Sequence, residues 1–398
     1  MQNTNPAKTA LYGSILPVIS QESCRCSPPS DAPAAGPDST RAFVLKMIAT
    51  PAGPVPQVAT VLKAADYWGT IKARWGEGRM TYRVDPGLYA VGYPNEQSPV
   101  LVSANYKMSF DHLRASLAGR DVWVLVLDTK GINVWCAAGK GTFGTEELIY
   151  RIESSGLRKA APRANLILPQ LGAPGVAAHV VKRKTGCKVQ YGPVRAADLG
   201  VYLDAGCKAT AAMRKVTFGL KDRAALIPME LSALFRYLIP VWLIFALLAS
   251  VLGYAALDHS GLDVFWAVFV GDGLFPVFAL GAAVLAGAVL HPVFLPLFPV
   301  RAFSGQGAFI GGIVAIAVLS VRGVEFRALP GLLEAIAWLF MIAAVSSYLA
   351  MNFTGSSTYA SLSGVKKEMR LALPLQIVAG SAGCLLWVAS LILSGGWI

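Results

Sequence analysis

Short apolar runs alternate with amphipathic segments between residues 41 and 225. The runs have the length of buried strands and are Leu88–Gly92, Val100–Ser103, Val122–Leu127, Leu166–Leu168 and Lys188–Tyr191. The segments with helical periodicity are Phe110–Leu117, Thr145–Ser155, Gly175–Lys184 and Ala196–Ala205. This alternation predicts a doubly wound, Rossmann-like α/β domain. Thr145 is its clearest candidate helix N-cap, and Gly156 is expected to end that helix.

Irregular loops rich in Gly and Pro follow several of the predicted strands. They cover residues 103–107, 128–144, 169–175 and 191–195. Because ligands in such domains bind outside the carboxyl ends of the strands, we expect these loops to gather at one edge. They should form a wide, shallow floor there, with Cys136 in the longest loop.

The pattern changes to long, nearly uncharged spans from residue 234 onward. These spans are Leu234–Leu257, Val264–Val300, Gly307–Val321, Leu329–Met351 and Leu371–Leu393. Each is long enough for a crossing, so residues 226–398 are predicted to form an all-α membrane domain of about five helices. The segment 264–300 leaves room for a re-entrant turn. Asp272 within it is either a functional group at membrane depth or part of an interfacial turn, which we favour.

Charge is divided as sharply as hydropathy. Residues 1–225 hold 28 of the 35 Lys and Arg and 16 of the 23 Asp and Glu, and therefore the whole net charge of +12. The positive-inside rule then puts the N-terminus and the α/β domain in the cytosol, and five crossings of the cytoplasmic membrane put the C-terminus outside. No nucleic-acid-binding motif accompanies the basic charge, so an anionic lipid surface is the expected neighbour and nucleic acid is not.

The six cysteines are scattered, without the spacing of a zinc site or an iron–sulfur cluster. Residues 1–40 are rich in Pro, Ser, Ala and Gly and are predicted to be a flexible tail, in which Cys24 and Cys26 are either incidental or hold a soft metal. Cys136 is different because it lies at the predicted ligand-binding edge, next to Trp135 and a run of small residues.

Several kinds of chemistry can be weighed for the Cys136 segment. Gly139–Gly144 matches G-x-G-x-x-G, but no acid follows the next strand to bind a ribose, which argues against a dinucleotide. A cysteine nucleophile needs a base, and neither His112 nor His179 has an evident orienting partner. A thiolate ligand remains, favoured near a helix N-terminus and by Lys140. A single thiolate suits a metal that brings its own macrocycle, a corrinoid or, in a more enclosed pocket, a haem.

The segment Asn133–Lys140, which reads NVWCAAGK, closely resembles the signature of the mercury-methylating corrinoid proteins, which pair a corrinoid domain with a membrane domain of about five spans. The resemblance extends through residues 100–107, 127–131, 168–176 and 191–195. The domain is also similar to the corrinoid-binding part of the large subunit of the acetyl-CoA-pathway corrinoid iron–sulfur protein, without that relative's barrel and cluster cysteines.

This resemblance implies roles for several residues of the loops, each of which, apart from Cys136, could instead be purely structural. Cys136 would be the lower axial ligand to the cobalt of a cobalamin-type corrinoid, and Lys140 would tune the thiolate or meet a corrin amide. The loop would be shaped by Asn133, Val134 and Trp135, and close approach would be permitted by Ala137, Ala138 and Gly139. The rim and tail of the corrinoid would be held by Gln170, Gly172, Gly175, Gly192 and Pro193.

The implied activity is a methyltransferase that moves a methyl group from methyl-cobalt(III) to Hg(II), giving methylmercury. A thiolate donor stabilises the Co(III) that remains after transfer to an electrophile, but it opposes reduction to Co(I) for reloading. The resemblance therefore implies a ferredoxin-like 4Fe–4S electron donor and a methyl donor system that uses a methylated pterin. The alternative is a membrane-anchored corrinoid methyl carrier with another physiological acceptor.

Overall fold

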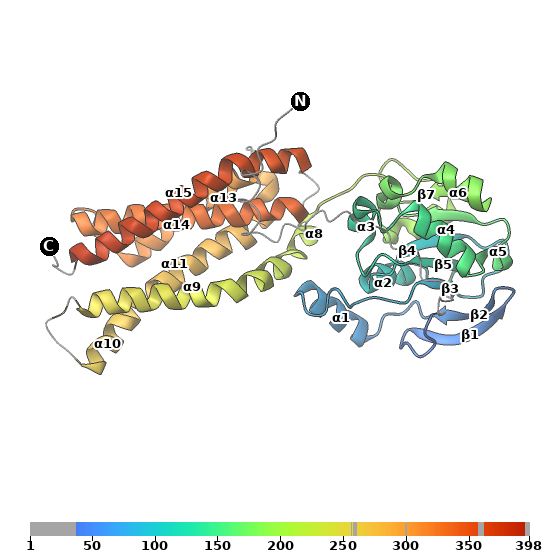
Figure 1. Cartoon of the computed structure of the whole chain (residues 1–398), viewed down its shortest axis with the longest axis horizontal. Coiled ribbons are helices and arrows are strands. Elements are labelled where there is room, and N and C mark those ends of the chain that lie inside the picture. Colours follow the sequence, from blue (N-terminus) through green and yellow to red (C-terminus); the bar gives the residue numbers. More distant parts are fainter. Residues whose placement is uncertain (1–36, 256, 258–260, 299–300, 357–361, 395–398) are drawn as a thin grey trace, which may run out of the picture. The chain divides into compact units, whose positions relative to one another are not determined.

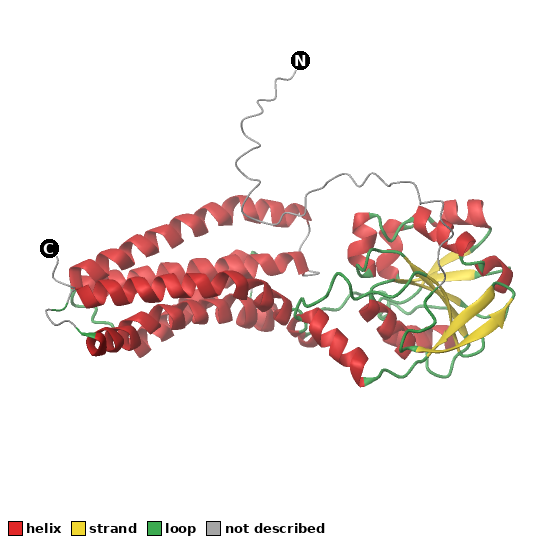
Figure 2. Ribbon diagram, turned by 60° about the horizontal axis from the view of Figure 1, so that its bottom comes forward, coloured by secondary structure: helices red, strands yellow, loops and turns green. Residues whose placement is uncertain are grey.

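The computed structural model describes residues 37–398 except 256, 258–260, 299–300, 357–361 and 395–398. Cys24, Cys26 and nearly all of the predicted tail lie outside the described residues. Figures 1 and 2 show the two kinds of architecture along the chain, an α/β domain and a helical region. The predicted fold class is therefore confirmed.

The α/β domain is built on one seven-stranded sheet in the order β1-β2-β3-β5-β4-β6-β7. All five predicted strands are present, as β3 (Gly87–Val91), β4 (Val100–Ala104), β5 (Val122–Leu127), β6 (Asn165–Leu168) and β7 (Lys188–Tyr191). Strands β5, β4, β6 and β7 are parallel, whereas β3 is antiparallel to β5. The four parallel strands bring the loops that follow them to one edge of the sheet, as expected.

Helices cover both faces of the sheet because the inner strands are apolar on both sides. In β5, Trp123, Leu125 and Leu127 face one core while Val122, Val124 and Val126 face the other. The first core is closed by α3 (Val134–Lys140), α4 (Thr145–Ser154), α5 (Leu157–Ala160) and α6 (Ala178–Thr185). The second is closed by α2 (Lys107–Ala115) and α7 (Leu199–Asp204), the latter preceded by the short helix η3 (Ala196–Asp198).

A hairpin at one sheet edge was not predicted. Strands β1 (Val44–Thr50) and β2 (Gly53–Val58) pair antiparallel, with Pro54 opposite Ala49 and Pro56 opposite Met47. Proline cannot donate to a ladder and argues against a central strand, so the sequence signal was weak. Helix α1 (Ala64–Arg74) follows this hairpin and was also missed.

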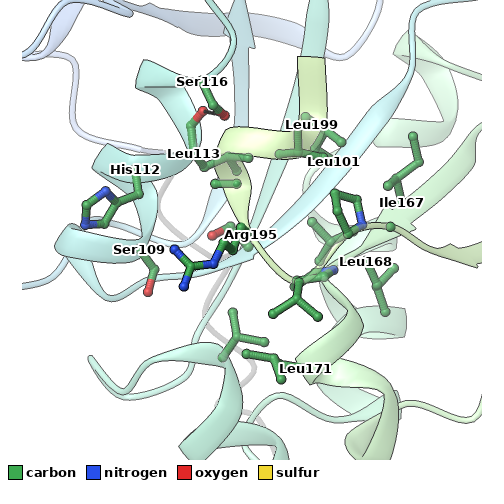
Figure 3. Close-up of a pocket in the computed structure, with 18 of the residues that line it drawn as sticks. Leu101, Ser109, His112, Leu113, Ser116, Ile167, Leu168, Leu171, Arg195 and Leu199 are labelled. Carbon is green, nitrogen blue, oxygen red and sulfur yellow. Dashed lines mark hydrogen bonds between the residues drawn. The ribbon is translucent and has the colours of Figure 1, made fainter. Parts of the chain in front are cut away.

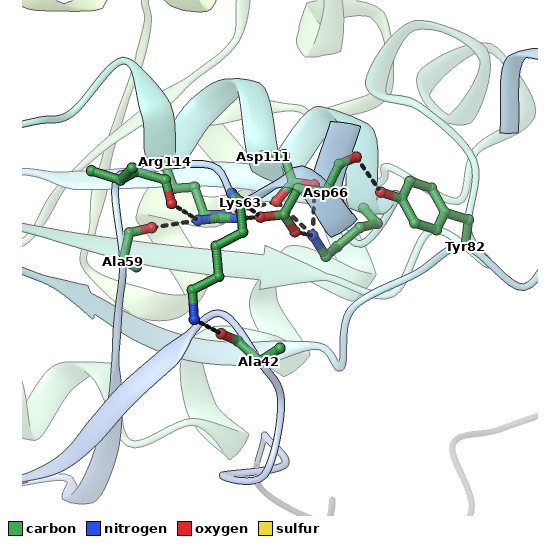
Figure 4. A network of polar contacts seen from close by, with 9 residues as sticks. Ala42, Ala59, Lys63, Asp66, Tyr82, Asp111 and Arg114 are labelled. Atoms are coloured by element: carbon green, nitrogen blue, oxygen red, sulfur yellow. Dashed lines mark hydrogen bonds and ion pairs between the residues drawn. The ribbon is translucent and has the colours of Figure 1, made fainter. Parts of the chain in front are cut away.

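Buried ion pairs connect α1 to α2 (Figure 4). Lys107 Nζ lies 2.7 Å from Asp66 Oδ1 and 2.6 Å from Asp111 Oδ2, and Arg114 contacts the same two carboxylates. Burial alone would raise the pKa of Asp66, but hydrogen bonds from Lys107 and the backbone of Lys63, with the charge of Arg114, lower it to about 2. This cluster fixes α1 against α2, the helix that follows β4.

Within the described residues, the helical region contains five helical segments long and apolar enough to cross a membrane, namely 220–255, 262–297, 303–322, 329–352 and 364–394. The first comprises α8 (Leu220–Ala224) and α9 (Ile227–Ala255). The others include α13 (Phe303–Arg322), α14 (Leu329–Asn352), which η7 (Phe353–Ser356) follows, and α15 (Leu362–Ser394). A Cβ on Gly307 or Gly311 of α13 would lie within 3 Å of Ser346 on α14, so small residues allow close helix packing.

The second segment is helical throughout its described length. It runs through α10 (Leu262–Val268), the π-helix η4 (Phe269–Gly273), α11 (Leu274–Val284), the π-helix η5 (Leu285–Leu290), α12 (His291–Phe294) and η6 (Leu295–Leu297). The glycine- and proline-containing stretch therefore forms a π-helical bulge where a turn was favoured. Asp272 lies in this bulge and pairs with Arg322 at the end of α13, 2.5 Å away.

Candidate functional site

A buried asparagine holds the loop that follows β5. Asn105, only 1% exposed, comes directly after β4. Its Oδ1 accepts hydrogen bonds from the backbone N–H of Thr129 (3.1 Å), the Thr129 hydroxyl (2.9 Å) and the backbone N–H of Gly131 (3.0 Å). Lys130 and Gly131 have φ of +59° and +73°, so the chain turns sharply here. One amide side chain thereby determines where the segment leading to Cys136 begins.

Asp128 attaches the same loop to α4. Its backbone N–H donates to Glu147 Oε1 at 2.8 Å, and Glu147 also pairs with Arg151. Although burial raises the pKa of the Asp128 carboxyl, hydrogen bonds from Lys130 lower it overall, so Asp128 is ionised at neutral pH. Asp128 Oδ1 accepts from Asn105 Nδ2 at 3.1 Å, so the contacts of Asn105 and those of Asp128 form one polar network.

The Cys136 segment is the helix α3, where a loop was expected. Asn133 is its N-cap, and Asn133 Oδ1 accepts from the backbone N–H of Cys136 at 2.9 Å. Gly141, with φ of +80°, ends the helix. Ala137 and Ala138 face the core, while Cys136 is exposed and Trp135 is 43% exposed. The helix therefore presents its thiol outward, with the N-terminal half of its backbone dipole behind it.

Two glycines of the following loop have packing roles in the structure. Gln170–Gly175 forms the 3₁₀ helix η2, which packs against α3. A Cβ on Gly172 would come 2.6 Å from the Phe143 ring, and one on Gly175 would come 2.0 Å from the Phe143 carbonyl oxygen. A Cβ on Gly139 would meet nothing within 4 Å. Gly172 and Gly175 thus fit η2 to α3, whereas the surface at Gly139 is open.

Helix α4, which follows α3 along the chain, begins one residue earlier than expected. Gly144 is the N-cap of α4, and Thr145 is its first residue. The Thr145 hydroxyl instead accepts the backbone N–H of Ala177 at 2.9 Å, so it joins α4 to the chain after η2. Ser155 caps the end of α4 and Gly156 follows with φ of +67°, as the sequence predicted.

A cavity of about 740 Å³ opens beside α3 at the carboxyl ends of β4 and β6 (Figure 3). Five of the predicted site residues line it, namely Asn133, Val134, Trp135, Gly192 and Pro193. Cys136 to Lys140, Gln170, Gly172 and Gly175 do not line it; Gln170 Oε1 accepts from Arg214 at 2.7 Å instead. Its volume lies in the range of small-molecule sites.

Other polar residues of the cavity were not predicted to line it. Ser109 and His112 contribute from α2 and Ser116 from its C-cap, and Figure 3 shows Ser109 and His112 on the same side as Arg195. Burial lowers the pKa of His112, with a further contribution from Arg74, so its imidazole is neutral at pH 7. The spacing of Ser109, His112 and Ser116, one polar face of a helix, was the available signal.

Comparison with known proteins concerns this same domain. Residues 72–203 match the family described as CO dehydrogenase/acetyl-CoA synthase delta subunit (CdhD). Acetyl-CoA decarbonylase/synthase complex subunit gamma of Methanopyrus kandleri is 30% identical over 128 residues, 32% of this chain and 27% of the relative. Subunit gamma 2 of Methanosarcina thermophila is 32% identical over 123 residues, 29% of this chain and 25% of the relative.

The similarity covers about a third of this chain and about a quarter of each relative. It runs from the end of α1 to α7 and includes α3, η2 and the cavity-lining loops. The relatives are, by name, subunits of a multi-protein complex. The α/β domain is thus related, over this segment, to subunits of acetyl-CoA decarbonylase/synthase complexes.

Proposed function

We propose that the α/β domain binds a corrinoid at the carboxyl edge of its parallel strands and that the chain is a corrinoid-dependent methyltransferase with Hg(II) as acceptor. The observation that carries this proposal is the exposed thiol of Cys136 on a capped helix beside an open cavity. The resemblance of Asn133–Lys140 to the mercury-methylating proteins and the relation to acetyl-CoA pathway subunits point in the same direction.

The residues present fit a large planar cofactor with a side group. The backbone at Gly139 is open, so a flat ring can approach α3 closely, and the exposed Cys136 thiol offers one soft ligand. The neighbouring cavity, walled by Trp135, Gly192 and Pro193, is large enough to hold part of such a molecule. When bound, the corrinoid would supply a methyl group carried on its metal, and Cys136 would be the residue that holds that metal.

The chain's own groups prepare the thiol for this role. Asn133 fixes the backbone N–H of Cys136 and with it the first turn of α3, from which the thiol is exposed. Lys140, in the last turn, adds a cation on the same helix. A sulfur ligand from Cys136 would favour giving the methyl group to an electrophile, and Hg(II) is a soft electrophile.

Partners follow from the same chemistry. The thiolate ligand that favours transfer to Hg(II) opposes reduction of the metal, so we infer a ferredoxin-like 4Fe–4S electron donor and a separate protein that delivers methyl groups from a methylated pterin. The five apolar helical segments support a multi-pass protein of the cytoplasmic membrane, with the α/β domain in the cytosol. The helical region would then serve as an anchor and docking platform.

The test compares full-length wild type with Cys136→Ala after both have been reconstituted with cobalamin, by their visible spectra and by mercury methylation. We expect the variant to stay folded, to show a changed visible spectrum because the sulfur ligand is gone, and to lose mercury methylation. Cys207→Ala, a half-buried thiol elsewhere in the domain, is the matched control and should behave as wild type. Methylation unchanged by Cys136→Ala would overturn the ligand assignment.

A second candidate is a membrane-anchored corrinoid carrier with another acceptor. It is favoured by the relatives' names, which describe subunits of acetyl-CoA decarbonylase/synthase complexes and not mercury enzymes. Comparing methyl transfer to Hg(II) with transfer to a thiol separates the two candidates. Transfer to the thiol that exceeds transfer to Hg(II) would favour the carrier.

A further inference from the structure

A second cavity, of about 670 Å³, lies among the helices of the membrane region, and the proposed methyl transfer does not use it. It is bounded by the N-terminal end of α13, by Ser347 of α14 and by α15 from Gly364 to Gln376. We propose that this cavity binds an anionic phospholipid, with the phosphate headgroup at Arg301 and Lys367 and an acyl chain along Leu371 and Leu375. This inference rests on the helical region spanning a membrane and is independent of the corrinoid.

The rim of the cavity carries positive charge that the described part of the chain leaves unpaired. Arg301 lies just before α13 and Lys367 in the second turn of α15, both exposed and without an ion-pair partner among the described residues. Glu368 also lines the cavity, but its Oε1 accepts the backbone N–H of Ser304 at 2.6 Å and so caps α13. Two cations at the rim are suited to a phosphate.

Below the rim, the wall becomes apolar. Lys367, Leu371 and Leu375 follow one another at four-residue spacing and lie on one face of α15. Leu371 and Leu375 are 71% and 69% exposed, so an acyl chain along this face would cover apolar surface that the protein leaves uncovered. From Lys367 to Leu375 the helix rises by about 12 Å, so polarity falls along the groove as it does from a headgroup into acyl chains.

A polar pair lies at the inner wall. Gln376 is only 8% exposed, its Nε2 donates to Ser347 Oγ at 2.8 Å, and its Oε1 has no partner within the described residues. Whichever way the amide is turned, one of its polar atoms is left for a ligand. When the amide is turned so that its nitrogen faces the cavity, an ester carbonyl of a phospholipid can accept from it, whereas a bare hydrocarbon would leave a buried polar atom unsatisfied.

The predicted topology places this cavity on the membrane side where such lipids lie. Arg301 follows the second span and Lys367 follows the fourth, so both fall on the cytosolic side if the N-terminus is inside. The structure brings them to the same cavity, as two residues on the same side of a membrane should be. The cytosolic leaflet is the anionic one.

The experiment titrates full-length protein in uncharged detergent with phosphatidylglycerol or with phosphatidylcholine of the same chain length, and native mass spectrometry counts bound lipids. We expect phosphatidylglycerol to bind preferentially, and Arg301→Gln with Lys367→Gln to weaken its binding about tenfold. The control is Lys366→Gln with Arg370→Gln, which removes two charges from the same end of α15 without touching the cavity wall.

Two further measurements distinguish a phospholipid in the cavity from phosphate bound only at its charged rim. Ala308→Phe should fill the cavity and reduce binding of the phospholipid with the rim charges intact. Inorganic phosphate at millimolar concentration should not displace the lipid, because the acyl chain contributes to binding. Equal binding of the two lipids, equal losses in both double variants, or displacement by phosphate alone would each overturn the proposal.

Discussion

Asn105 has more influence on the candidate site than its position outside the cavity suggests. Its single carbonyl oxygen satisfies two backbone N–H groups and one hydroxyl of the turn at Thr129–Gly131. The two backbone N–H groups are buried, so neither can turn to water when the amide is lost, whereas the Thr129 hydroxyl can still donate to the carbonyl oxygen of Ile132. The position of Asn133, and through it the cap of α3, depends on this turn.

Replacing this amide should therefore loosen the site as well as the fold. We expect Asn105→Ala to cost about 2–4 kcal/mol of stability, because it strands buried donors. Thermal unfolding of the full chain in detergent measures this cost, and the visible spectrum with cobalamin reports the site. Asn165→Ala removes an exposed amide pair on β6 and should cost less than about 1 kcal/mol. Equal effects of the two substitutions would contradict the role of Asn105.

At the scale of elements, the contact between α3 and η2 determines the shape of the floor. The backbones of the two helices approach closely because Gly172 and Gly175 have no side chains, and Phe143 fills the space beside them. Gly139, the penultimate residue of α3, has open space beside it and an ordinary helical backbone. These glycines came from one predicted set, but the structure gives them different constraints.

A matched pair of substitutions tests this difference. Gly175→Ala should destabilise the domain by about 1–3 kcal/mol through the clash with Phe143. Gly139→Ala should leave stability unchanged or raise it by up to about 1 kcal/mol, because alanine favours the helix. If a flat cofactor rests on this surface, Gly139→Ala should nevertheless weaken cobalamin binding, measured by titration and visible absorbance. Unweakened binding would show that the cofactor does not approach Gly139.

The contact between α1 and α2 should make stability depend on acid. The pKa of Asp66 in the folded chain, about 2, lies below its usual value of 3.8. Folding is therefore favoured by the ionised carboxylate above about pH 4, and this contribution is lost as the pH falls toward 2. Asp66→Asn should lower stability at neutral pH, since Lys107 loses a buried partner, and flatten the pH dependence between pH 4 and 2.

The control for this prediction is an exposed ion pair. Asp204 pairs with Arg120 at the surface, where solvent screens the interaction, so Asp204→Asn should change unfolding temperatures little at any pH. Thermal unfolding between pH 2 and 7 compares both variants with the wild type. If the unfolding temperatures of Asp66→Asn and the wild type fall in parallel between pH 4 and 2, the cluster around Asp66 does not cause the loss of stability in acid.

Sequence patterns predicted the elements whose residues are almost all apolar or follow a clear period. Strand β5 is apolar on both faces and could be placed to the residue, whereas β1 and β2 include solvent-facing positions and two prolines. Helix α3 was missed because it has seven residues, too few for a periodic signal, and contains Gly139. The cavity was missed as such because its α2 residues and the loop after β7 are distant in sequence and line one cavity only once the sheet has formed.

For the whole molecule, hydropathy predicted all five candidate spans, but the helices extend beyond the apolar stretches into charged residues. Lys366, Lys367 and Arg370 were expected between spans, yet they lie in the first turns of α15, which begins at Leu362. Charged residues are compatible with a helix that extends beyond the apolar core of a bilayer, because long basic side chains reach the interface. The apolar length of a span therefore understates the length of its helix.

The last prediction concerns the direction of these spans. If all five cross and the basic α/β domain is cytosolic, the C-terminus lies outside. Alkaline phosphatase fused after Ile398 should then be active, and green fluorescent protein at the same place should be dark. Fusions after Arg301, following two spans, should give the opposite pair of results. The prediction fails if the C-terminus is cytosolic and alkaline phosphatase is active after Arg301. Segment 262–297 would then enter and leave the membrane on the same side, despite its continuous helix.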